Sequence, residues 1–359
     1  MSRAAYFKYL EETAAVVGPF IEKLLQPYRE EPDGLYDALM LFAGTRLRRP
    51  LQKPALLRLS YEVCGGKDWE RYVPVAAAFE LLNISSYQAN ASFDNKLGTL
   101  TDEKKDAQFI CSMISRELAI KTLRGCPALS AQALAGLEES IGRVNEHIYL
   151  AQYYDLFVLN VRRLDAYRAD EALFLADYEK RCFLGSGVFN GQICHWGARL
   201  AAGNRDCLAA LQAFGETFGT ALQIANDTGD YSPTDPNEPN PRDYQDRYSD
   251  FRNGRLTAIL YYLLARCPER GKEFFDYETG LPRRSAELIG RLSVAAAECG
   301  GMNYAKNLVV ELSKSAKASL AEFGAAPAAN LLKQLASVLT ANKFNTAFRK
   351  TPNHGCAAK

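Results

Sequence analysis

The sequence predicts an all-α fold, and three observations support this prediction. Segments rich in Ala, Leu and Glu recur along the 359 residues, and most of them carry apolar residues three and four positions apart, which is the spacing of one helix face. Proline and glycine residues separate these segments. Alternating polar and apolar runs, which are typical of half-buried strands, are lacking. We therefore expect one helical domain over residues 1–359.

Breaks in the pattern set the ends of the expected helices, in order along the chain. Pro32-Asp33-Gly34 follows the first segment, and Gly65-Gly66, Pro127, Gly203-Asn204 and Pro268 separate later ones. Such residues punctuate helices because glycine is conformationally free and proline lacks a backbone donor. The expected helices are 5–27, 34–44, 50–64, 72–89, 104–123, 130–160, 170–201, 205–231, 253–265, 284–298, 302–322 and 326–342.

Composition limits the classes of function. Hydrophobic residues make up 48% of the chain, enough for a large core, and the net charge of +1 gives no field that would argue for nucleic-acid binding. No run of eighteen apolar residues occurs, so we expect no membrane span. The first residues do not resemble a signal peptide. The nine cysteines form no Cys-x-x-Cys pair, which favours reduced thiols and a cytoplasmic protein.

One segment differs in kind from the rest. Residues 232–250 carry four prolines among many Asp, Asn and Arg residues. This composition cannot bury a helix face, so it predicts a long polar loop. Such a loop acts either as a lid over a site or as a plain linker, and its own sequence does not separate the two.

Polar residues cluster on one face of the segment just before this loop. Steps of three and four residues place four of them together: Gln223, Asn226, Asp227 and Asp230. The flanking Phe214, Phe218 and Leu222 are too apolar for a solvated face. Carboxylate and amide oxygens are ligands that Mg²⁺ prefers. Periodicity alone leaves two interpretations open, a metal site and a buried polar network.

Other motifs stand in a fixed order around this cluster. A basic turn covers residues 44–50, a small-residue helix leads into 85–95, and Gln152-Tyr153-Tyr154-Asp155-Leu156, Tyr178-Glu179-Lys180 and Asn253-Gly254-Arg255-Leu256-Thr257 follow. Together with Gln223-Ile224-Ala225-Asn226-Asp227, this order resembles the trans-isoprenyl diphosphate synthase (polyprenyl synthetase) family. The resemblance covers about residues 40–260, and the helices of 284–342 carry no motif.

The resemblance implies an all-α bundle of the isoprenoid synthase type with a central cavity. In that family two acidic helices hold Mg²⁺ ions that clamp the diphosphate of an allylic prenyl diphosphate, and the departing diphosphate leaves an allylic cation. Apolar walls keep water from the cation. Isopentenyl diphosphate is the second substrate, and the enzymes are usually homodimers. The implied cofactor is therefore Mg²⁺, and the implied assembly is a homodimer.

The resemblance also assigns roles to individual residues. Catalysis is assigned to Asp227, Asp230, Lys180 and Asp94. Metal binding is assigned to Asp227, Asp230, Asn226, Asn90 and Asp94. Substrate binding is assigned to Arg46, Arg48, Arg49, Gln223, Arg255, Asn83, Ser85, Ser86 and Gln152. The basic turn aligns in two ways, so either Arg48 or Arg49 acts with Arg46.

Several positions depart from the family pattern. The first acidic motif reads Asn90-Ala91-Ser92-Phe93-Asp94, with one carboxylate in place of three. The arginine pair after that helix is replaced by the single Lys96, and Asn83 replaces the histidine that binds the second substrate. Arg255 stands where the family has lysine. Small residues at Ser85 and Ser86, in place of bulky aromatics, predict a prenyl chain of three or more isoprene units.

Three functions stay open, and they are ordered here by preference. The first is a prenyl diphosphate synthase that condenses an allylic diphosphate with isopentenyl diphosphate. The second is an enzyme like a class I terpene synthase, which cyclises or quenches the allylic cation without isopentenyl diphosphate. The third is a non-catalytic subunit that regulates an active homologue.

Overall fold

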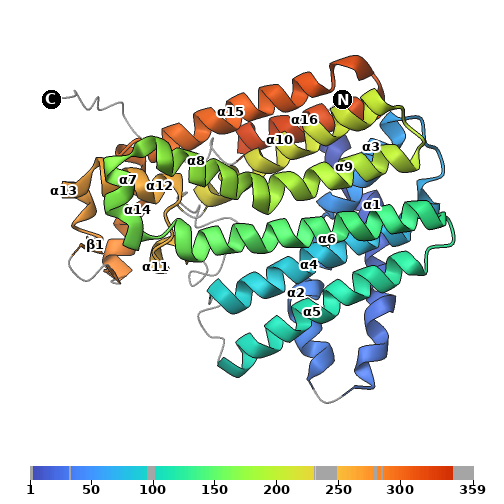
Figure 1. Cartoon of the computed structure of the whole chain (residues 1–359), viewed down its shortest axis with the longest axis horizontal. Helices are drawn as coiled ribbons and strands as arrows, with labels where there is room; N and C mark the ends of the chain where they lie inside the picture. The colour runs from blue at the N-terminus through green and yellow to red at the C-terminus, as the bar shows by residue number, and fades with distance from the viewer. Residues whose placement is uncertain are drawn as a thin grey trace.

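Helices form nearly all the secondary structure of the chain in the computed structural model (Figure 1), which confirms the all-α prediction. The structure describes residues 3–31, 34–94, 102–229, 231, 249–277, 281–283 and 286–342. The α-helices are α1 (Arg3–Leu25), α2 (Leu35–Leu47), α3 (Gln52–Val63), α4 (Val73–Asp94), α5 (Asp102–Arg124), α6 (Ala131–Tyr153), α7 (Leu164–Ala169), α8 (Glu171–Cys182), α9 (Val188–Leu200), α10 (Arg205–Gly229), α11 (Ser249–Arg252), α12 (Ala258–Tyr261), α13 (Pro268–Gly271), α14 (Ala286–Glu298), α15 (Gly301–Ser319) and α16 (Pro327–Asn342).

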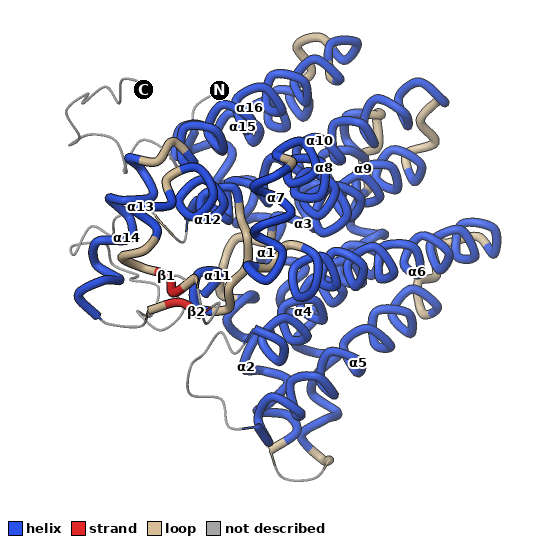
Figure 2. The backbone as a smooth tube through the Cα atoms, turned by 60° about the vertical axis from the view of Figure 1, so that its left-hand side comes forward, coloured by secondary structure: helices blue, strands red, loops and turns tan. Residues whose placement is uncertain are grey.

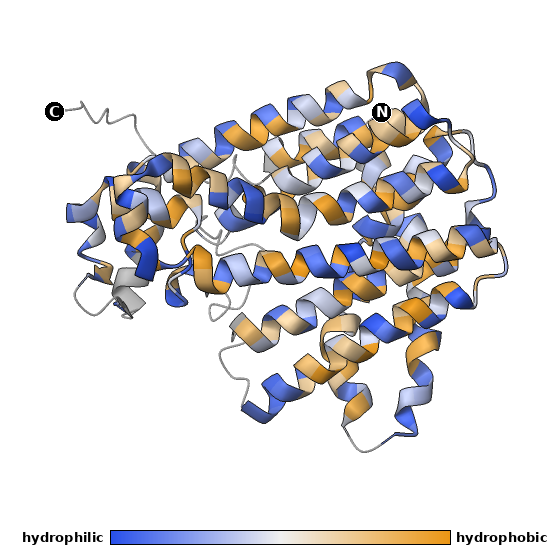
Figure 3. Cartoon of the chain, viewed as in Figure 1, coloured by the Kyte–Doolittle hydropathy of each residue, from blue (hydrophilic) through white to orange (hydrophobic). Residues whose placement is uncertain are grey.

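The long helices lie side by side along the long axis of the molecule. Figure 1 shows α4, α6, α9, α10 and α15 in this order, and each packs against the next, with α5 on the outer side of α4. Apolar and polar stretches alternate around each of these helices (Figure 3), as expected for helices with one buried face. Most of the buried apolar residues form one connected cluster from Tyr6 in α1 to Leu339 in α16.

Two glycines bring α10 close to the backbone of its neighbour. A Cβ atom at Gly215 would collide with the carbonyl oxygen of Asn190 in α9, and one at Gly219 with the carbonyl oxygen of Ser186. Only glycine permits this approach, because any side chain would push the helices apart. The contact fixes α10, which carries the polar cluster, against α9.

π-helical turns occur in the predicted helices 130–160 and 170–201, and a third lies at the end of the predicted helix 253–265. Within the expected helix 130–160, α6 ends at Tyr153, and the π turn Tyr154–Val158 follows it. The expected helix 170–201 consists of α8, the π turn Phe183–Gly187 and α9. Such turns widen the helix locally and are frequent at functional sites.

The predicted helix 253–265 is wrong in its first turn. Gly254 has a φ of 64°, and the chain there forms an isolated antiparallel bridge between Asn160 and Arg255. The amide of Val161 donates to the carbonyl of Gly254 (2.9 Å), and the amide of Leu256 donates to the carbonyl of Leu159 (2.9 Å). Helix α12 begins only at Ala258, and a π turn, Tyr262–Arg266, follows it. Long-range pairing therefore overrides the local helical preference.

A small hairpin was not predicted. The strands β1 (Phe275–Asp276) and β2 (Leu281–Pro282) pair antiparallel, and Figure 2 shows them near α11 at one end of the molecule. Two-residue strands are too short to give a periodic pattern.

The single-domain expectation for 1–359 stays a prediction. Among the described helices, none combines the length and the apolar character that a membrane span needs.

Candidate active site

A cavity of about 1070 Å³ opens between the helices and collects most of the predicted site residues. Helix α1 and helix α16, which lie outside the motif-bearing region, also line it. The apolar lining consists of Phe7, Leu10, Leu41, Phe42, Ile148, Phe189, Leu222, Leu335, Val338 and Leu339. A cavity that combines apolar walls with many polar and charged side chains suits an amphiphilic ligand with one charged end.

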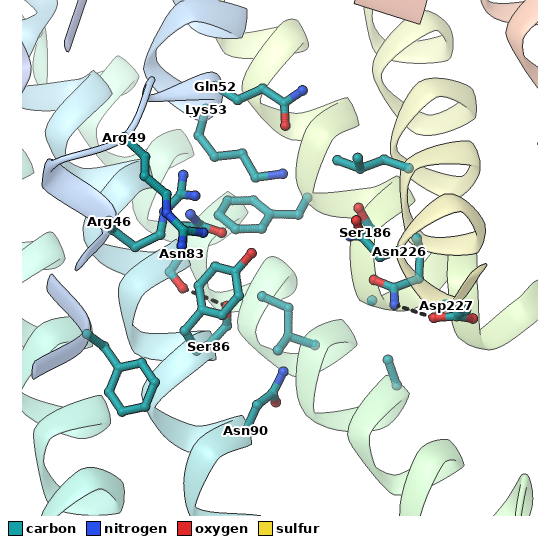
Figure 4. A pocket seen from close by; sticks show the side chains of 18 of the residues that line it. Arg46, Arg49, Gln52, Lys53, Asn83, Ser86, Asn90, Ser186, Asn226 and Asp227 are labelled. Carbon is teal, nitrogen blue, oxygen red and sulfur yellow. Dashed lines mark hydrogen bonds between the residues drawn. The ribbon is translucent and has the colours of Figure 1, made fainter. Parts of the chain in front are cut away.

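Cationic side chains from α2, the basic turn and α3 form one wall of this cavity. Figure 4 shows Arg46, Arg49 and Lys53 together on this side, near Asn83 of α4. Arg46 Nε lies 3.2 Å from Oε1 of the fully buried Glu80, which also accepts from Asn83 Nδ2 at 2.9 Å. Burial lowers the pKa of Arg46, but Glu80 outweighs this effect and the net pKa is raised. Glu80 therefore holds Arg46 charged and in place.

Lys53 is a member of this cationic wall that the sequence analysis missed. Its ammonium donates to Asn190 Oδ1 at 2.7 Å and lies 5.0 Å from the centre of the Phe189 ring. Only 7% of the residue is exposed. Burial lowers its pKa to about 8, and the nearby Glu80 opposes that shift. The ammonium thus has a hydrogen-bonded amide partner and a ring beneath it, and it lines the cavity.

The opposite wall is built around Asp227 of α10, with Asn226 beside it (Figure 4), and Gln223 of the same helix also lines the cavity. Asp227 is buried. Its Oδ2 accepts from Tyr178 Oη (2.8 Å) and Arg181 Nη1 (2.8 Å), and its Oδ1 accepts from Arg181 Nη1 (3.1 Å) and Gln223 Nε2 (3.1 Å). Both carboxylate oxygens are therefore engaged by side chains of α8 and α10.

Arg181 joins Asp227 to a second carboxylate. Its Nε donates to Asp155 Oδ1 at 2.6 Å, and Asp155 lies in the π turn after α6. Burial lowers the pKa of Arg181, but Asp155 and Asp227 together hold it well above its usual value. Burial raises the pKa of Asp227, and the Arg181 guanidinium opposes this shift. The guanidinium stays charged between the two acids.

The isolated bridge between Asn160 and Arg255 positions one more cation. Arg255 is 4% exposed and lines the cavity beside Asp250, with Nη1 4.0 Å from Asp250 Oδ1. The amide of Arg255 donates to the carbonyl of Asp250 at 2.8 Å. The left-handed Gly254 makes this turn possible, because a Cβ there would lie 2.8 Å from Val161 Cγ2. The predicted residue Arg255 is thus brought to the cavity by a loop and not by a helix.

Helix α4 directs only some of its predicted residues to the cavity. Asn83, Ser86 and Asn90 lie on the lining face, at steps of three and four. Ser85 does not line the cavity: it faces α5, where its hydroxyl donates to the carbonyl of Ser112 at 2.8 Å. The prediction that Ser85 widens the cavity floor is therefore not supported by its placement, because it lies about 100° around the helix from Ser86.

Arg48 and Lys180 also lie outside the cavity. Of the two alternatives in the basic turn, Arg49 lines the cavity and the exposed Arg48 does not. Lys180 is exposed, with its ammonium 5.4 Å from the centre of the Tyr154 ring. The buried face of α8 holds Phe174, Tyr178 and Arg181, at steps of four and three. The next residue in the chain, Arg181, therefore takes the cavity position that the resemblance gave to Lys180.

Gln152 is buried and lines the cavity, and its role in substrate binding stays a prediction. Asp230 lies outside the described residues, as do the side chain of Asp94 and residues 232–248 of the predicted loop 232–250, whose last two residues belong to α11. The roles of Asp94 and Asp230 stay predictions. Sequence analysis missed three members of the site, Lys53, Asp155 and Arg181. The periodicity of the buried face of α8 contained the signal for Arg181.

The described residues do not form a magnesium site of the kind the resemblance implies. On α4, Asn90 brings no charge and Ala91 is fully buried. On α10, both oxygens of Asp227 accept hydrogen bonds from protein side chains. Within these ranges no three His, Cys, Asp or Glu side chains gather closely enough to hold a metal ion.

Comparison with known proteins finds likeness in structure alone. No family model matches the sequence, and no curated protein matches it. Polyprenyl synthase from Caulobacter crescentus, solved with calcium and isoprenyl diphosphate, superposes with a TM-score of 0.75 at 18% identity, over 94% of this chain and 98% of that one. Geranylgeranyl pyrophosphate synthetase from Pyrococcus horikoshii has a TM-score of 0.74 at 18% identity, over 94% and 98%.

A third similar structure is geranylgeranyl pyrophosphate synthase from Corynebacterium glutamicum, solved with isoprenyl diphosphate and magnesium. It superposes with a TM-score of 0.72 at 17% identity, over 92% of this chain and 99% of that one. The match extends over nearly the whole of each chain, beyond the motif-bearing region 40–260. The chain therefore has the all-α fold of the trans-prenyl diphosphate synthases.

Proposed function

We propose that the protein binds an allylic prenyl diphosphate in the cavity and transfers its prenyl group. One observation carries this proposal: cationic side chains and long apolar walls line the same cavity. The diphosphate binds to Arg46, Arg49 and Lys53, because guanidinium and ammonium groups suit phosphate oxygens. The prenyl chain packs against residues such as Leu41, Phe42, Phe189 and Leu339.

The arrangement favours loss of the diphosphate. The cations are fixed before the ligand enters, through Glu80 for Arg46 and Asn190 for Lys53, so they stabilise developing negative charge on the leaving group without first reorganising. The apolar lining keeps water away from an allylic cation. The acceptor in the preferred reaction is the double bond of isopentenyl diphosphate, and the product is a longer trans-prenyl diphosphate.

A second candidate is a non-catalytic protein that binds prenyl diphosphates and regulates an active homologue. One observation favours it: Arg181 engages both oxygens of Asp227, the carboxylate that the resemblance places on a metal. Such a protein keeps the cavity and the cationic wall but does not ionise its ligand.

Product analysis distinguishes these functions. The purified chain is incubated with geranyl, farnesyl or geranylgeranyl diphosphate, with and without isopentenyl diphosphate, and in Mg²⁺ or EDTA. Longer diphosphates that require isopentenyl diphosphate support the transferase. Hydrocarbons or alcohols formed without it support the terpene synthase-like alternative. Binding without any product supports the regulatory protein, and the absence of binding would contradict all three.

A homodimer also belongs to this proposal. Ile110 and Met113 lie one turn apart on α5 and expose 55% and 51% of their surface, more than apolar side chains usually do. Pairing through α5 would cover them. Light scattering of the wild type and of Met113→Lys tests this: the wild type should have twice the mass of the chain, and the variant should dissociate. A monomeric wild type would contradict the homodimer.

A further inference from the structure

Arg181 lies between two carboxylates on the cavity wall, and the resemblance does not account for it. Its Nε is 2.6 Å from Asp155 Oδ1, and its Nη1 is 2.8 and 3.1 Å from the two oxygens of Asp227. The side chains of Arg181 and Asp227 are 6% and 3% exposed. Water therefore solvates these charges poorly, and the guanidinium and the carboxylates stabilise one another.

The hydrogen bonds to Asp227 leave little room for a metal ion. Each carboxylate oxygen already accepts two hydrogen bonds, from Arg181, Tyr178 and Gln223. Mg²⁺ needs close, near-octahedral oxygen ligands. An ion at Asp227 would have to displace one of these donors and would lie beside a permanent guanidinium charge, which repels it.

The charge balance of the described lining points the same way. Five cationic side chains line the cavity (Arg46, Arg49, Lys53, Arg181 and Arg255), against three acidic ones (Asp155, Asp227 and Asp250). The surplus is two positive charges, and Glu80, which is buried behind Arg46, reduces it to one. A cavity wall with a surplus of positive charge attracts an anionic ligand and repels an additional metal cation.

Helix register keeps Arg181 in this position. Phe174, Tyr178 and Arg181 form the buried face of α8, and the Phe174 and Tyr178 rings stack with centroids 5.8 Å apart. The π turn Phe183–Gly187 follows directly. If Arg181 moved out to solvent, Asp155 and Asp227 would be left without their shared cation, which is costly at buried positions.

Resting on the proposed function, we infer that Arg181 is a built-in cation that replaces a divalent metal ion on this wall. The cavity then binds the diphosphate group of its ligand without a divalent metal. The positive charges that the anion requires come from Arg46, Arg49 and Lys53, while Arg181 neutralises the acids that would otherwise repel it.

Calorimetric titration of the full chain with farnesyl thiodiphosphate tests this inference. One series contains EDTA and the other Mg²⁺. The two dissociation constants should differ by less than about tenfold. Binding that occurs only with Mg²⁺ would overturn the inference but leave the proposed function intact. The absence of binding in both series would contradict the proposed function, and the inference with it.

A pair of adjacent variants provides a second test with a readout other than ligand binding. Arg181→Gln frees Asp155 and Asp227, so it should gain a Mn²⁺ site that electron paramagnetic resonance detects. Lys180→Gln removes a charge just outside the cavity and should bind Mn²⁺ like the wild type. A folded Arg181→Gln protein without the additional site would overturn the inference.

Circular dichroism shows whether Arg181→Gln folds. If it does not, Arg181→Lys keeps one positive charge at the same place. This variant should still bind farnesyl thiodiphosphate in EDTA. Arg181→Lys could instead require Mg²⁺ for ligand binding although the wild type does not. This result would fit the inference only if the variant also bound Mn²⁺. A requirement for Mg²⁺ in a variant that does not bind Mn²⁺ would contradict the inference.

Discussion

Helices α4 and α10 both line the cavity, and each departs differently from an acidic metal-binding helix. On α4 the lining side chains are neutral, Asn83, Ser86 and Asn90. On α10 the carboxylate of Asp227 is present but is paired with Arg181. The described side chains of α4 in the lining carry no charge, whereas α10 presents a carboxylate whose charge Arg181 compensates. An acidic residue on a cavity wall is therefore not by itself a metal ligand.

The largest expected effect is on the free energy of unfolding, which a substitution in α10 should lower far more than one in α4. Asp227→Ala leaves Arg181, Tyr178 and Gln223 without their shared acceptor, so it should lower the free energy of unfolding by about 3–5 kcal/mol. Asn90→Ala on α4 should change it by less than about 0.5 kcal/mol. Urea denaturation followed by circular dichroism measures both. Equal effects of the two substitutions would break the comparison.

A second effect concerns the cationic wall beside α4. Arg49→Ala should weaken the affinity for farnesyl thiodiphosphate by about tenfold or more, because a hydrogen bond to a charged group contributes about 1.5–3 kcal/mol. Arg48→Ala is the matched control, since Arg48 is the exposed neighbour outside the cavity. Calorimetry should find the control unchanged. Weakening by Arg48→Ala alone would reverse the assignment of the basic turn.

Lys53 should make binding depend on pH. Burial lowers its pKa to about 8, with Glu80 raising it and Arg46 lowering it further. The ammonium form, which attracts a diphosphate, predominates below this pH and is lost above it. The affinity for inorganic pyrophosphate should therefore fall by about tenfold as the pH rises through 8. In Lys53→Met this part of the pH dependence should be missing. Identical slopes in both proteins would exclude Lys53 from the binding wall.

The smallest expected effect concerns the two serines of α4. Ser86→Phe projects into the cavity and should weaken binding of geranylgeranyl diphosphate relative to inorganic pyrophosphate, by less than about tenfold. Ser85→Phe should leave this ratio unchanged and lower stability instead, because it meets α5. Competition binding and thermal unfolding check the pair. A changed ratio in Ser85→Phe and not in Ser86→Phe would contradict the helix register described here.

The helices could be predicted from the sequence, because each long helix repeats its apolar residues over several turns. The turn at Gly254 could not, since its conformation depends on pairing with residues 159–161. Within the site, the motif order grouped Arg46, Gln152, Gln223 and Asp227, and all four line one cavity. Their roles in binding and catalysis stay proposals.

The differences between the residues that the resemblance assigns and those that line the cavity come from reading motifs by sequence position and not by helix face. Lys180 matches the family motif in sequence, but Arg181 lies three residues after Tyr178 and shares its buried face. Asp227 finds its partner 46 residues away, a contact that no local pattern encodes. Lys53 lies in a mostly buried helix and donates a hydrogen bond to Asn190, which is 137 residues away in the sequence. This contact depends on the packing of α3 against α9.

The proposed function requires that a prenyl diphosphate lies with its diphosphate on the cationic wall of this cavity. A crystal structure of the protein with farnesyl thiodiphosphate, grown in EDTA, tests it most directly. Phosphate oxygens should lie within hydrogen-bond distance of Arg46, Arg49 and Lys53, with the Arg181–Asp227 pair intact. A ligand bound elsewhere, or one whose diphosphate contacts Asp227 after Arg181 has moved away, would contradict it.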